Sequence, residues 1–371
     1  ALGLEGGHSV RRIVHAGGSS TGRRVTRQLS ALVAEHARIE VLEDCRAIQL
    51  PTLGGRCAGV RLHDGRVVTA RAVVLATGGA AALWSRTTNP VGAVGAGMVL
   101  AHGAGAALAD LEMMQFHPTA VSGANGADGF LVTEAIRGEG ARLLDAAGER
   151  FVDELAPRDE VALAVARRMR DTGAPSVGLD MRSVDPALFP NVVAVLRRSG
   201  IDPTRDLVPV APAAHYTMGG IATDLEGRAS LPGLYAVGEC ACTGLHGANR
   251  LASNSLSECF VFGRRAALAA LAEPAPRRGP EPGPGLPRPE LTAASREALW
   301  RHAGIEREAE GLRTLLTDPH PLVRLIASCA LAREESRGAH LRSDRPERDP
   351  ALDEHHTVVR DADRPVLEHW A

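Results

Sequence analysis

Hydrophobic and polar residues follow both helical and strand patterns along residues 9–78. Apolar residues at helical spacing predict a helix over 23–36, and a short apolar run predicts a strand over 39–42. Residues 59–70 predict a hairpin closed by an Asp-Gly turn, because strand-forming residues flank that turn on both sides. The run 72–76 is apolar without alternation, which is typical of a buried strand in a parallel sheet covered on both faces.

The pattern changes in the middle of the chain. Residues 92–111 are rich in Ala and Gly and helix-like, which fits close helix packing and a phosphate cradle equally well. Residues 111–215 contain short apolar runs, several turns and one clear helix over 158–171, and this mixture predicts an inserted α+β domain. A second buried strand is predicted over 234–237, followed by a helix over 255–271.

The C-terminal third begins with a change in composition. Residues 273–290 are dense in Pro, Gly and Arg, so they predict a linker. Residues 291–316 and 321–335 both carry apolar residues at helical spacing, and we expect a helical hairpin or small bundle there. The remaining stretch to residue 371 is polar, and we expect it to be irregular.

Composition and charge narrow the class of protein. Hydrophobic residues make up 44% and charged residues 23%, which indicates a folded globular protein. The 42 basic residues, all Arg, balance 44 acidic ones, so neither a nucleic-acid-binding surface nor a lysine nucleophile is predicted. No run of about 18 apolar residues and no signal peptide are found, so a cytoplasmic location without a membrane span is expected. The six cysteines form no CxxC pair, and no metal site is predicted.

Two histidines and two arginines beside glycines are candidates for binding an anion. His117 precedes a proline, which favours an extended backbone, and His215 precedes a Gly-Gly pair. Arg158 follows Pro157 at the start of the predicted helix, where the helix dipole disfavours a cation unless an anion lies nearby. Together with Arg250 they suit a small dicarboxylate, because the guanidinium fork is complementary to a carboxylate. Taken singly, each also fits a structural role.

A longer set of motifs resembles one flavoprotein family, that of succinate dehydrogenase, fumarate reductase and L-aspartate oxidase. The motifs follow the family's order from Glu5 to about Asp344, at residues 76–79, 116–119, 133–140, 156–159, 215–220, 233–239, 246–256 and 335–340. Within the family, Glu5-Gly-Gly-His-Ser and His15-Ala-Gly-Gly are most similar to the L-aspartate oxidase branch. There, a glutamate at the place of Glu5 is thought to meet the substrate amino group.

The resemblance implies a fold, a cofactor and a reaction. The implied fold is a Rossmann-like α/β FAD-binding domain (1–110 and 216–272), an α+β capping domain (111–215), the linker 273–290 and a C-terminal helical domain (291–371). The implied reaction is oxidation of L-aspartate to iminoaspartate, by hydride transfer to the N5 atom of non-covalent FAD, with oxygen or fumarate as acceptor. That reaction begins the quinolinate route to NAD, so hand-over of iminoaspartate to quinolinate synthase is a further expectation.

The resemblance also implies a role for individual residues. Arg158 is similar to the proton-transfer arginine beside the flavin, with Glu134 and Arg137 as the relay behind it. An arginine is a demanding acid or base, because its ordinary pKa is about 12.5 to 13.8, and a second cation would make its proton easier to lose. The implied substrate contacts are Glu5, His117, Thr133, His215 and Arg250. The implied flavin contacts are Thr77, Gly78, Gly79, Glu239, Ser255 and Leu256, the last two at a helix start suited to negative charge.

The sequence departs from the family in two places. It contains no GxGxxG turn for the FAD pyrophosphate, and Gly95-Ala96-Gly97 is the nearest approximation, so we expect an N-terminally truncated chain. Ala96 stands where relatives usually carry an aspartate. Two alternatives therefore stay open: a succinate- or fumarate-linked subunit with an iron–sulfur partner, and a non-catalytic fragment unable to hold FAD. Glu5 separates the first from an aspartate oxidase, since succinate and fumarate carry no amine.

Overall fold

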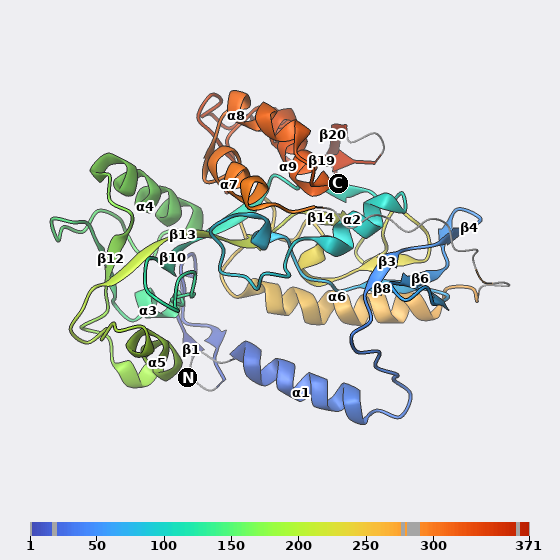
Figure 1. Ribbon diagram of the computed structural model, residues 1–371, viewed down its shortest axis with the longest axis horizontal. Coiled ribbons are helices and arrows are strands. Elements are labelled where there is room, and N and C mark those ends of the chain that lie inside the picture. The colour runs from blue at the N-terminus through green and yellow to red at the C-terminus, as the bar shows by residue number, and fades with distance from the viewer. Residues whose placement is uncertain (1, 17–20, 276–278, 280–289, 361–363, 371) are drawn as a thin grey trace. The chain divides into compact units, whose positions relative to one another are not determined.

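The chain divides into two compact units, each described here by itself. The computed structural model describes residues 2–16, 21–275, 279, 290–360 and 364–370 (Figure 1). The first unit comprises residues 1–45 and 117–213, and the second comprises residues 46–116 and 214–371. Two of the passages between the units fall within strands β10 (Met114–Val121) and β13 (Val208–Thr217). Most of the predicted linker 273–290 lies outside the described residues.

The first unit is an α+β structure that combines most of the predicted inserted segment 111–215 with residues 1–45, which the sequence analysis assigns to the FAD-binding domain. Its helices are α1 (Thr21–Glu35), α3 (Ala135–Gly138), α4 (Arg158–Thr172) and α5 (Pro190–Arg198), and its other strands are β1 (Leu2–Gly3), β2 (Ile13–Val14), β11 (Arg142–Leu144) and β12 (Val177–Asp180). The main sheet has the order β10-β13-β12-β11. Buried residues such as Ile136, Val161 and Leu179 join the sheet and the helices in one core. Helix α4 begins at Arg158 as predicted and ends at Thr172, and it is capped by Gly173, whose φ of 68° is the left-handed conformation that favours glycine.

The strand predicted over residues 39–42 is absent from the structure. These four residues have no regular secondary structure, and Ile39 and Val41 are exposed. A short apolar run forms a strand only where a partner strand supplies hydrogen bonds, and no described strand pairs with this one. The predicted helix over 23–36 is confirmed as α1, although none of its side chains is buried.

The second unit holds the remaining elements. Its strands are β3 (Ala47–Gln49), β4 (Thr52–Leu53), β5 (Arg56–Cys57), β6 (Gly59–Leu62), β7 (Val67–Thr69), β8 (Val73–Leu75), β9 (Leu108–Ala109), β14 (Gly220–Ala222), β15 (Leu234–Ala236), β16 (Ala241–Cys242), β17 (Glu306–Arg307), β18 (Leu341–Arg342), β19 (His355–Val359) and β20 (Pro365–His369). Its helices are α2 (Ala96–Gly103), α6 (Asn254–Leu271), α7 (Ala293–His302), α8 (Ala309–Thr314) and α9 (Pro321–Ala332).

Two predicted buried strands pair with each other in this unit. Strand β8 lies parallel to β15, with Leu75 opposite Ala236. The carboxyl ends of parallel neighbours meet at one edge of a sheet, where open α/β sheets bind their ligands. The Thr-Gly-Gly motif follows β8 and the Gly-Glu motif follows β15. The pairing of two short strands thus brings together two motifs that are more than 150 residues apart.

The C-terminal region contains more strand than the sequence predicts. The predicted helical pattern is present, but its first half is split into α7 and α8 by β17. The polar tail, expected to be irregular, forms the antiparallel pair β19 and β20. These strands complete a five-stranded sheet of order β16-β14-β9-β19-β20. The polar residues of β19 and β20 gave no apolar strand signal, and the pairing of β19 with β9 is a long-range contact that sequence pattern cannot show.

Buried arginines tie this C-terminal region to the segment that follows β9. Arg333, 1% exposed, donates from Nε to Oε1 of the fully buried Glu112 at 2.7 Å and from Nη1 to Glu335 at 3.1 Å. Burial lowers the pKa of Arg333, but the neighbouring carboxylates more than offset this, and the pKa is raised above its usual value. Arg307 donates to the Glu112 carbonyl oxygen at 2.7 Å. The motif at 335–340 therefore contributes to a buried ionic cluster.

We predict that Arg333→Met destabilises the chain by about 3–5 kcal/mol, because it leaves buried carboxylates without their cation. The measurement is the free energy of unfolding in urea. Arg348→Met is the matched control: Arg348 pairs with Asp353 at 2.7 Å, but its side chain is 61% exposed. Exposed ion pairs contribute about 0–1 kcal/mol to stability, so the control substitution should lower the free energy of unfolding by no more than about 1 kcal/mol. Equal effects of the two substitutions would contradict the prediction.

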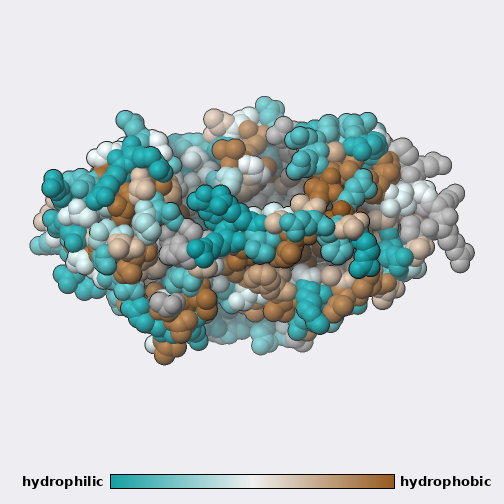
Figure 2. Space-filling model, turned by 90° about the horizontal axis from the view of Figure 1, so that it is seen from below, coloured by the Kyte–Doolittle hydropathy of each residue, from teal (hydrophilic) through white to brown (hydrophobic). Residues whose placement is uncertain are grey.

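The surface carries an apolar stripe on helix α6. Its members share one side of the helix and are 41–72% exposed: Leu256, Phe260, Val261, Leu268 and Leu271. Figure 2 shows several apolar patches among polar residues on the molecular surface. Among the described residues, no helix combines the length and the apolar character needed to cross a membrane.

Candidate active site

A buried carboxylate between two arginines is the centre of the site in the first unit. Glu134, at the N-terminus of α3, accepts from Nε of Arg158 at 2.5 Å, and its other oxygen lies 3.2 Å from Nη2 of Arg137. All three residues are at least 93% buried. The Glu134–Arg137 pair has the i, i+3 spacing predicted from sequence. Arg158 begins α4, and Glu134 supplies the anion that its position at the positive helix end requires.

The electrostatics of this group follow from burial and charge. Burial raises the pKa of Glu134, but Arg158 and Arg137 together outweigh it, so the pKa is lowered and the carboxylate stays ionised. Burial lowers the pKa of Arg137, and Glu134 offsets only part of that effect. Arg137 also donates to the backbone oxygen of Glu154. The arrangement can therefore hold a cation next to a fixed negative charge away from water.

Glu5 lies beside this group. Its side chain is buried, and its charge acts directly on Arg137. The neighbouring Gly6 donates its backbone N–H to Glu134, and a Cβ at Gly6 would overlap Glu134 Oε1. Only glycine permits this approach. The Glu-Gly-Gly motif thus places Glu5 in the same cluster as Glu134, Arg137 and Arg158.

His117 and Thr133 lie on neighbouring segments of the first unit. His117 is fully buried on β10, and its Nδ1 accepts from the Thr119 backbone N–H at 3.2 Å. Thr119 in turn exchanges hydrogen bonds with Val132, through its own carbonyl oxygen and its hydroxyl group, both at 3.0 Å. Thr133 follows Val132 and is half-buried. The hydrogen bonds between Thr119 and Val132 therefore bring the segments that carry His117 and Thr133 side by side, although the two residues are 16 positions apart in the sequence.

His215 and Arg250 belong to the second unit. His215 Nδ1 forms a hydrogen bond with Thr88 at 2.8 Å, which fixes the ring, and its carbonyl oxygen accepts from Asn89 at 2.7 Å. The guanidinium of Arg250 stacks 4.3 Å from the centre of the Tyr216 ring and donates to Ser255 Oγ at 3.2 Å. A stacked, buried guanidinium keeps its planar fork oriented for a carboxylate.

A polar network behind Arg250 was not predicted from the sequence. Glu258 accepts from Tyr216 at 3.2 Å and from Thr243 at 2.7 Å, and it pairs with His246 Nε2 at 2.8 Å. Burial raises the pKa of Glu258, yet hydrogen bonds from His246 and its other partners lower it overall. Glu258 is a buried acid within the apolar pattern of α6, and that mismatch was the available signal. The network holds Tyr216, and through it Arg250, in place.

The residues assigned to the flavin converge within the second unit. Gly79 follows β8, Glu239 follows β15, and a Cβ at Gly79 would overlap the Glu239 carboxylate. Glu239 accepts from the Thr217 backbone N–H at 2.9 Å. Thr77 is exposed, while Gly78 adopts a φ of 73° that favours glycine. A half-buried carboxylate, a close glycine turn and exposed neighbours suit the approach of a flat polar ring.

Ser255 and Leu256 lie in the first turn of α6, where backbone N–H groups are available to a ligand. Ser253 precedes the helix with a φ of 60°. An 18-residue helix presents partial positive charge at this end, which suits negative charge on a bound ring. Elsewhere in the unit, Ala96 begins α2 and lines a cavity of 670 Å³ together with Leu100 and Arg296. The residues present fit the flavin end of FAD, and this chain carries no GxGxxG turn for the pyrophosphate.

Glu239 makes the stability of the cofactor-free chain depend on pH. Burial raises its pKa from 4.5 to about 7, although Thr217 and Arg250 oppose the shift. Between pH 4.5 and 7 the folded state therefore binds more protons than the unfolded state, so stability falls as pH rises. We predict that the free energy of unfolding, relative to Glu239→Gln, falls by up to about 3 kcal/mol across this window. Urea unfolding without FAD at pH 5, 6, 7 and 8 measures it.

The matched control for this prediction is Glu226→Gln. Glu226 is an exposed acid in the same unit, and it pairs with Arg228 at 3.1 Å at the surface. The Glu226→Gln variant should show the same pH dependence of the free energy of unfolding as the wild type. A wild-type chain whose stability relative to Glu239→Gln is constant from pH 5 to 8 would rule out the raised pKa.

Comparison with known protein families identifies two regions of the chain. The FAD binding domain family matches residues 1–256. The fumarate reductase flavoprotein C-terminal family matches residues 321–369. Among solved structures, a quinol-fumarate reductase with menaquinol molecules aligns with a TM-score of 0.87 at 28% identity, over 100% of this chain and 79% of that one. An E. coli quinol fumarate reductase aligns with a TM-score of 0.85 at 28% identity, over 99% and 77%.

Curated relatives named L-aspartate oxidase have higher identity. An L-aspartate oxidase of Caulobacter vibrioides is 47% identical over 381 residues, covering 94% of this chain and 73% of that protein. An L-aspartate oxidase of Streptomyces coelicolor is 41% identical over 435 residues, covering 100% and 75%. The family implied by the sequence motifs and its FAD cofactor are confirmed. The chain belongs to the L-aspartate oxidase family, within the larger family of FAD-binding succinate dehydrogenase and fumarate reductase flavoproteins.

Proposed function

We propose that this protein oxidises L-aspartate to iminoaspartate with FAD as cofactor. The observation that carries the proposal is the buried Glu5 carboxylate beside Arg137, Glu134 and Arg158. Aspartate differs from succinate and fumarate by its α-ammonium group, a cation that a carboxylate can bind through a charge-assisted hydrogen bond. The identity with L-aspartate oxidases supports the same assignment.

Four residues are proposed to bind the two substrate carboxylates. They are His117, Thr133, His215 and Arg250, the residues for which the family resemblance implies this role. Arg250 supplies a permanent charge and a planar fork, and its stacking on Tyr216 limits its rotation before substrate arrives. The bond from Thr88 fixes the His215 ring in the same way. Preorganised groups of this kind lower the entropy cost of orienting a small substrate.

FAD, when bound, supplies the hydride acceptor. For the Cα–H bond to break, the nitrogen must donate its lone pair into the new C=N bond, so the substrate amine must first lose its extra proton. Glu5 is proposed to hold this amine, and Arg158 with Glu134 and Arg137 to provide the route for proton movement. Glu134 holds the Arg158 side chain by its Nε atom at 2.5 Å. This bond fixes the Arg158 guanidinium beside the Glu134 carboxylate.

The metabolic and cellular setting is part of the same proposal. Iminoaspartate contains a hydrolysable C=N bond, so a following enzyme must use it promptly. We propose a place at the start of NAD synthesis by the quinolinate route, with quinolinate synthase as the next enzyme and the cytoplasm as the location. Oxygen or fumarate is the proposed final electron acceptor.

The first experiment records the absorbance spectrum of the chain purified with excess FAD, before and after L-aspartate under anaerobic conditions. Loss of the oxidised flavin absorbance with L-aspartate, and not with succinate, is the expected result. Bleaching with succinate alone would instead favour a succinate-linked flavoprotein. A chain that retains no FAD after gel filtration would mean that this polypeptide by itself is not the catalyst.

A further inference from the structure

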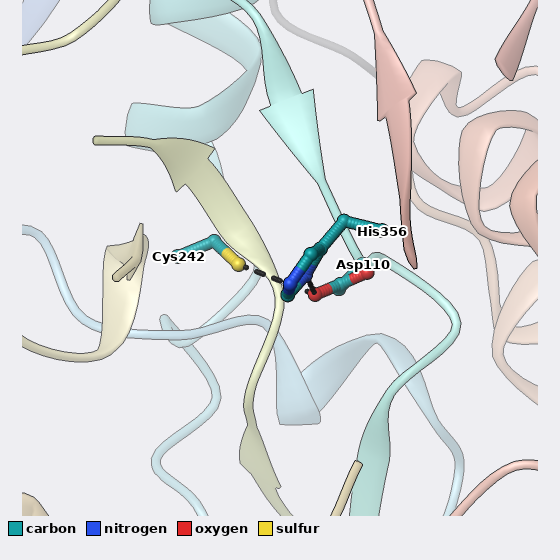
Figure 3. A group of neighbouring side chains, drawn as sticks. All are labelled: Asp110, Cys242 and His356. Carbon is teal, nitrogen blue, oxygen red and sulfur yellow. Dashed lines mark hydrogen bonds and ion pairs between the residues drawn. The ribbon is translucent and has the colours of Figure 1, made fainter. Parts of the chain in front are cut away.

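Three side chains of different chemistry meet in the second unit, and none of them is assigned to substrate or flavin. Asp110 follows β9, Cys242 ends β16 and His356 lies on β19, and these strands belong to the same five-stranded sheet (Figure 3). Their donor atoms lie within 4.8 Å of one another. Figure 3 shows the carboxylate, the thiol and the imidazole pointing toward a common centre. The proposed oxidation of aspartate uses none of the three.

One oxygen of the Asp110 carboxylate is held in place by neighbouring groups, and the other faces Cys242 and His356. Oδ1 accepts from the Thr357 backbone N–H at 3.2 Å and lies 3.6 Å from Arg333. Oδ2 faces the two remaining side chains: Cys242 Sγ is 3.6 Å away, and His356 Nδ1 is hydrogen-bonded to it. Outer contacts that orient a carboxylate in this way are characteristic of metal ligands.

The cysteine and the histidine are held with similar definition. Cys242 is 2% exposed and packs with Ala107, Ala109 and Val358. Burial and the Asp110 carboxylate raise the pKa of its thiol well above the usual range, so without a metal the sulfur keeps a proton and donates it toward Oδ2. The His356 ring stacks on Trp370 with centres 4.1 Å apart. A metal ion would take the place of the protons that these donors now direct at Asp110.

We propose that Asp110, Cys242 and His356 form a binding site for one zinc ion. Zinc accepts sulfur, nitrogen and oxygen ligands together, whereas Mg²⁺ and Ca²⁺ bind oxygen. A tetrahedral zinc ion, with Zn–S and Zn–O bonds of about 2.3 and 2.1 Å, holds sulfur and oxygen about 3.6 Å apart. The Cys242–Asp110 separation has that value in the absence of metal. The His356 ring needs to withdraw from Asp110 to reach the ligand spacing of about 3.3 Å.

Charge and access are consistent with this site. A thiolate and a carboxylate neutralise Zn²⁺, and the imidazole binds as a neutral ligand. The nearby Arg333 is already balanced by Glu112 at 2.7 Å and Glu335 at 3.1 Å. Asp110 and His356 also line a cavity of 160 Å³, which provides room for a water ligand and a route for the ion. Three protein ligands and one water complete a tetrahedron.

The test is a titration of the purified 371-residue chain, stripped with a chelator and free of FAD, with CoCl₂ alone. Cobalt(II) takes zinc-type sites and gives a near-ultraviolet charge-transfer band when bound to a thiolate. We expect this band to saturate at about one equivalent and to disappear when ZnCl₂ is added. Absence of the band at one equivalent would overturn the proposal.

Variants assign the band to these residues. Cys242→Ser should abolish it, whereas Cys240→Ser should retain it, because the buried Cys240 thiol donates elsewhere, to the Leu75 carbonyl oxygen at 3.2 Å. A band that persists in Cys242→Ser would overturn the proposal. His356→Gln is the second variant, since the His356 side chain is 15% exposed and less critical for packing. Its zinc affinity should fall at least about tenfold, measured by competition with a chromophoric chelator. Unchanged affinity would also overturn the site.

Discussion

Arg158→Leu is expected to lower turnover of L-aspartate at least about a thousandfold while leaving the FAD content unchanged. The physical reason is the loss of the guanidinium that pairs with the buried Glu134 and is assigned to proton transfer at the substrate. The substitution removes the guanidinium but keeps Arg137 as a cation for Glu134. Steady-state turnover and flavin absorbance of the FAD-loaded protein are the measurements.

Arg167→Leu provides the control for this experiment. Arg167 lies on the same helix, α4, but is exposed, so its substitution should leave turnover within about twofold. Substantial turnover in Arg158→Leu would remove Arg158 from the proton-transfer role. Loss of flavin as well as turnover would point to a structural role, and thermal unfolding of both variants separates these outcomes.

Glu5→Gln is expected to reduce kcat/KM for L-aspartate by about 10- to 150-fold, while fumarate reduction changes little. A charge-assisted hydrogen bond contributes about 1.5–3 kcal/mol. Aspartate has an ammonium group that makes such a bond to Glu5, whereas fumarate has none, so the substitution weakens the binding of aspartate alone. Glutamine keeps the size of the side chain, which is buried, and removes only its charge. The comparison uses two assays of the FAD-loaded protein: oxidation of L-aspartate, and reduction of fumarate by flavin that a chemical reductant has reduced beforehand.

The matched control is Glu139→Gln in the same unit. Glu139 is a half-buried acid that pairs with Arg11 at 2.7 Å and has no assigned role in the reaction. Both activities should be retained in this variant. Equal losses of aspartate oxidation and fumarate reduction in Glu5→Gln would show that Glu5 does not recognise the amine.

Hydrophobic periodicity and turn residues predicted the elements that depend only on their own stretch of sequence. Helices α1, α4 and α6, and the hairpin of β6 and β7, were predicted within a few residues of their observed bounds. The error over residues 39–42 and the missing prediction of β19 and β20 share one cause. A short strand exists only through its partners, and the partner that joins β19 and β20 to the sheet is β9, almost 250 residues earlier. Periodicity within a window contains no information about such a partner.

The candidate site shows the same division. The Glu134–Arg137 pair follows from helical spacing, and the need for an anion near Arg158 follows from the helix dipole. The pairing of Glu134 with both arginines could not be predicted from spacing alone: the family resemblance suggested it and the structure places the three side chains together. The hydrogen bond between Glu258 and Tyr216, and the contact between Asp110 and Cys242, depend on the tertiary packing of distant segments. The chemistry of single residues could therefore be predicted from the sequence, whereas their positions relative to one another could not.

The apolar stripe of α6 has a consequence for handling the protein. The helix is 18 residues long, about 27 Å, and Phe260 and Leu271 on its exposed side are 56% and 72% accessible. An apolar strip of this length attracts amphiphilic dyes and the matrices used in hydrophobic-interaction chromatography. Salts that are excluded from protein surfaces strengthen such contacts. Ammonium sulfate should therefore precipitate this chain at lower concentration than Phe260→Ser, a difference that a solubility curve makes visible.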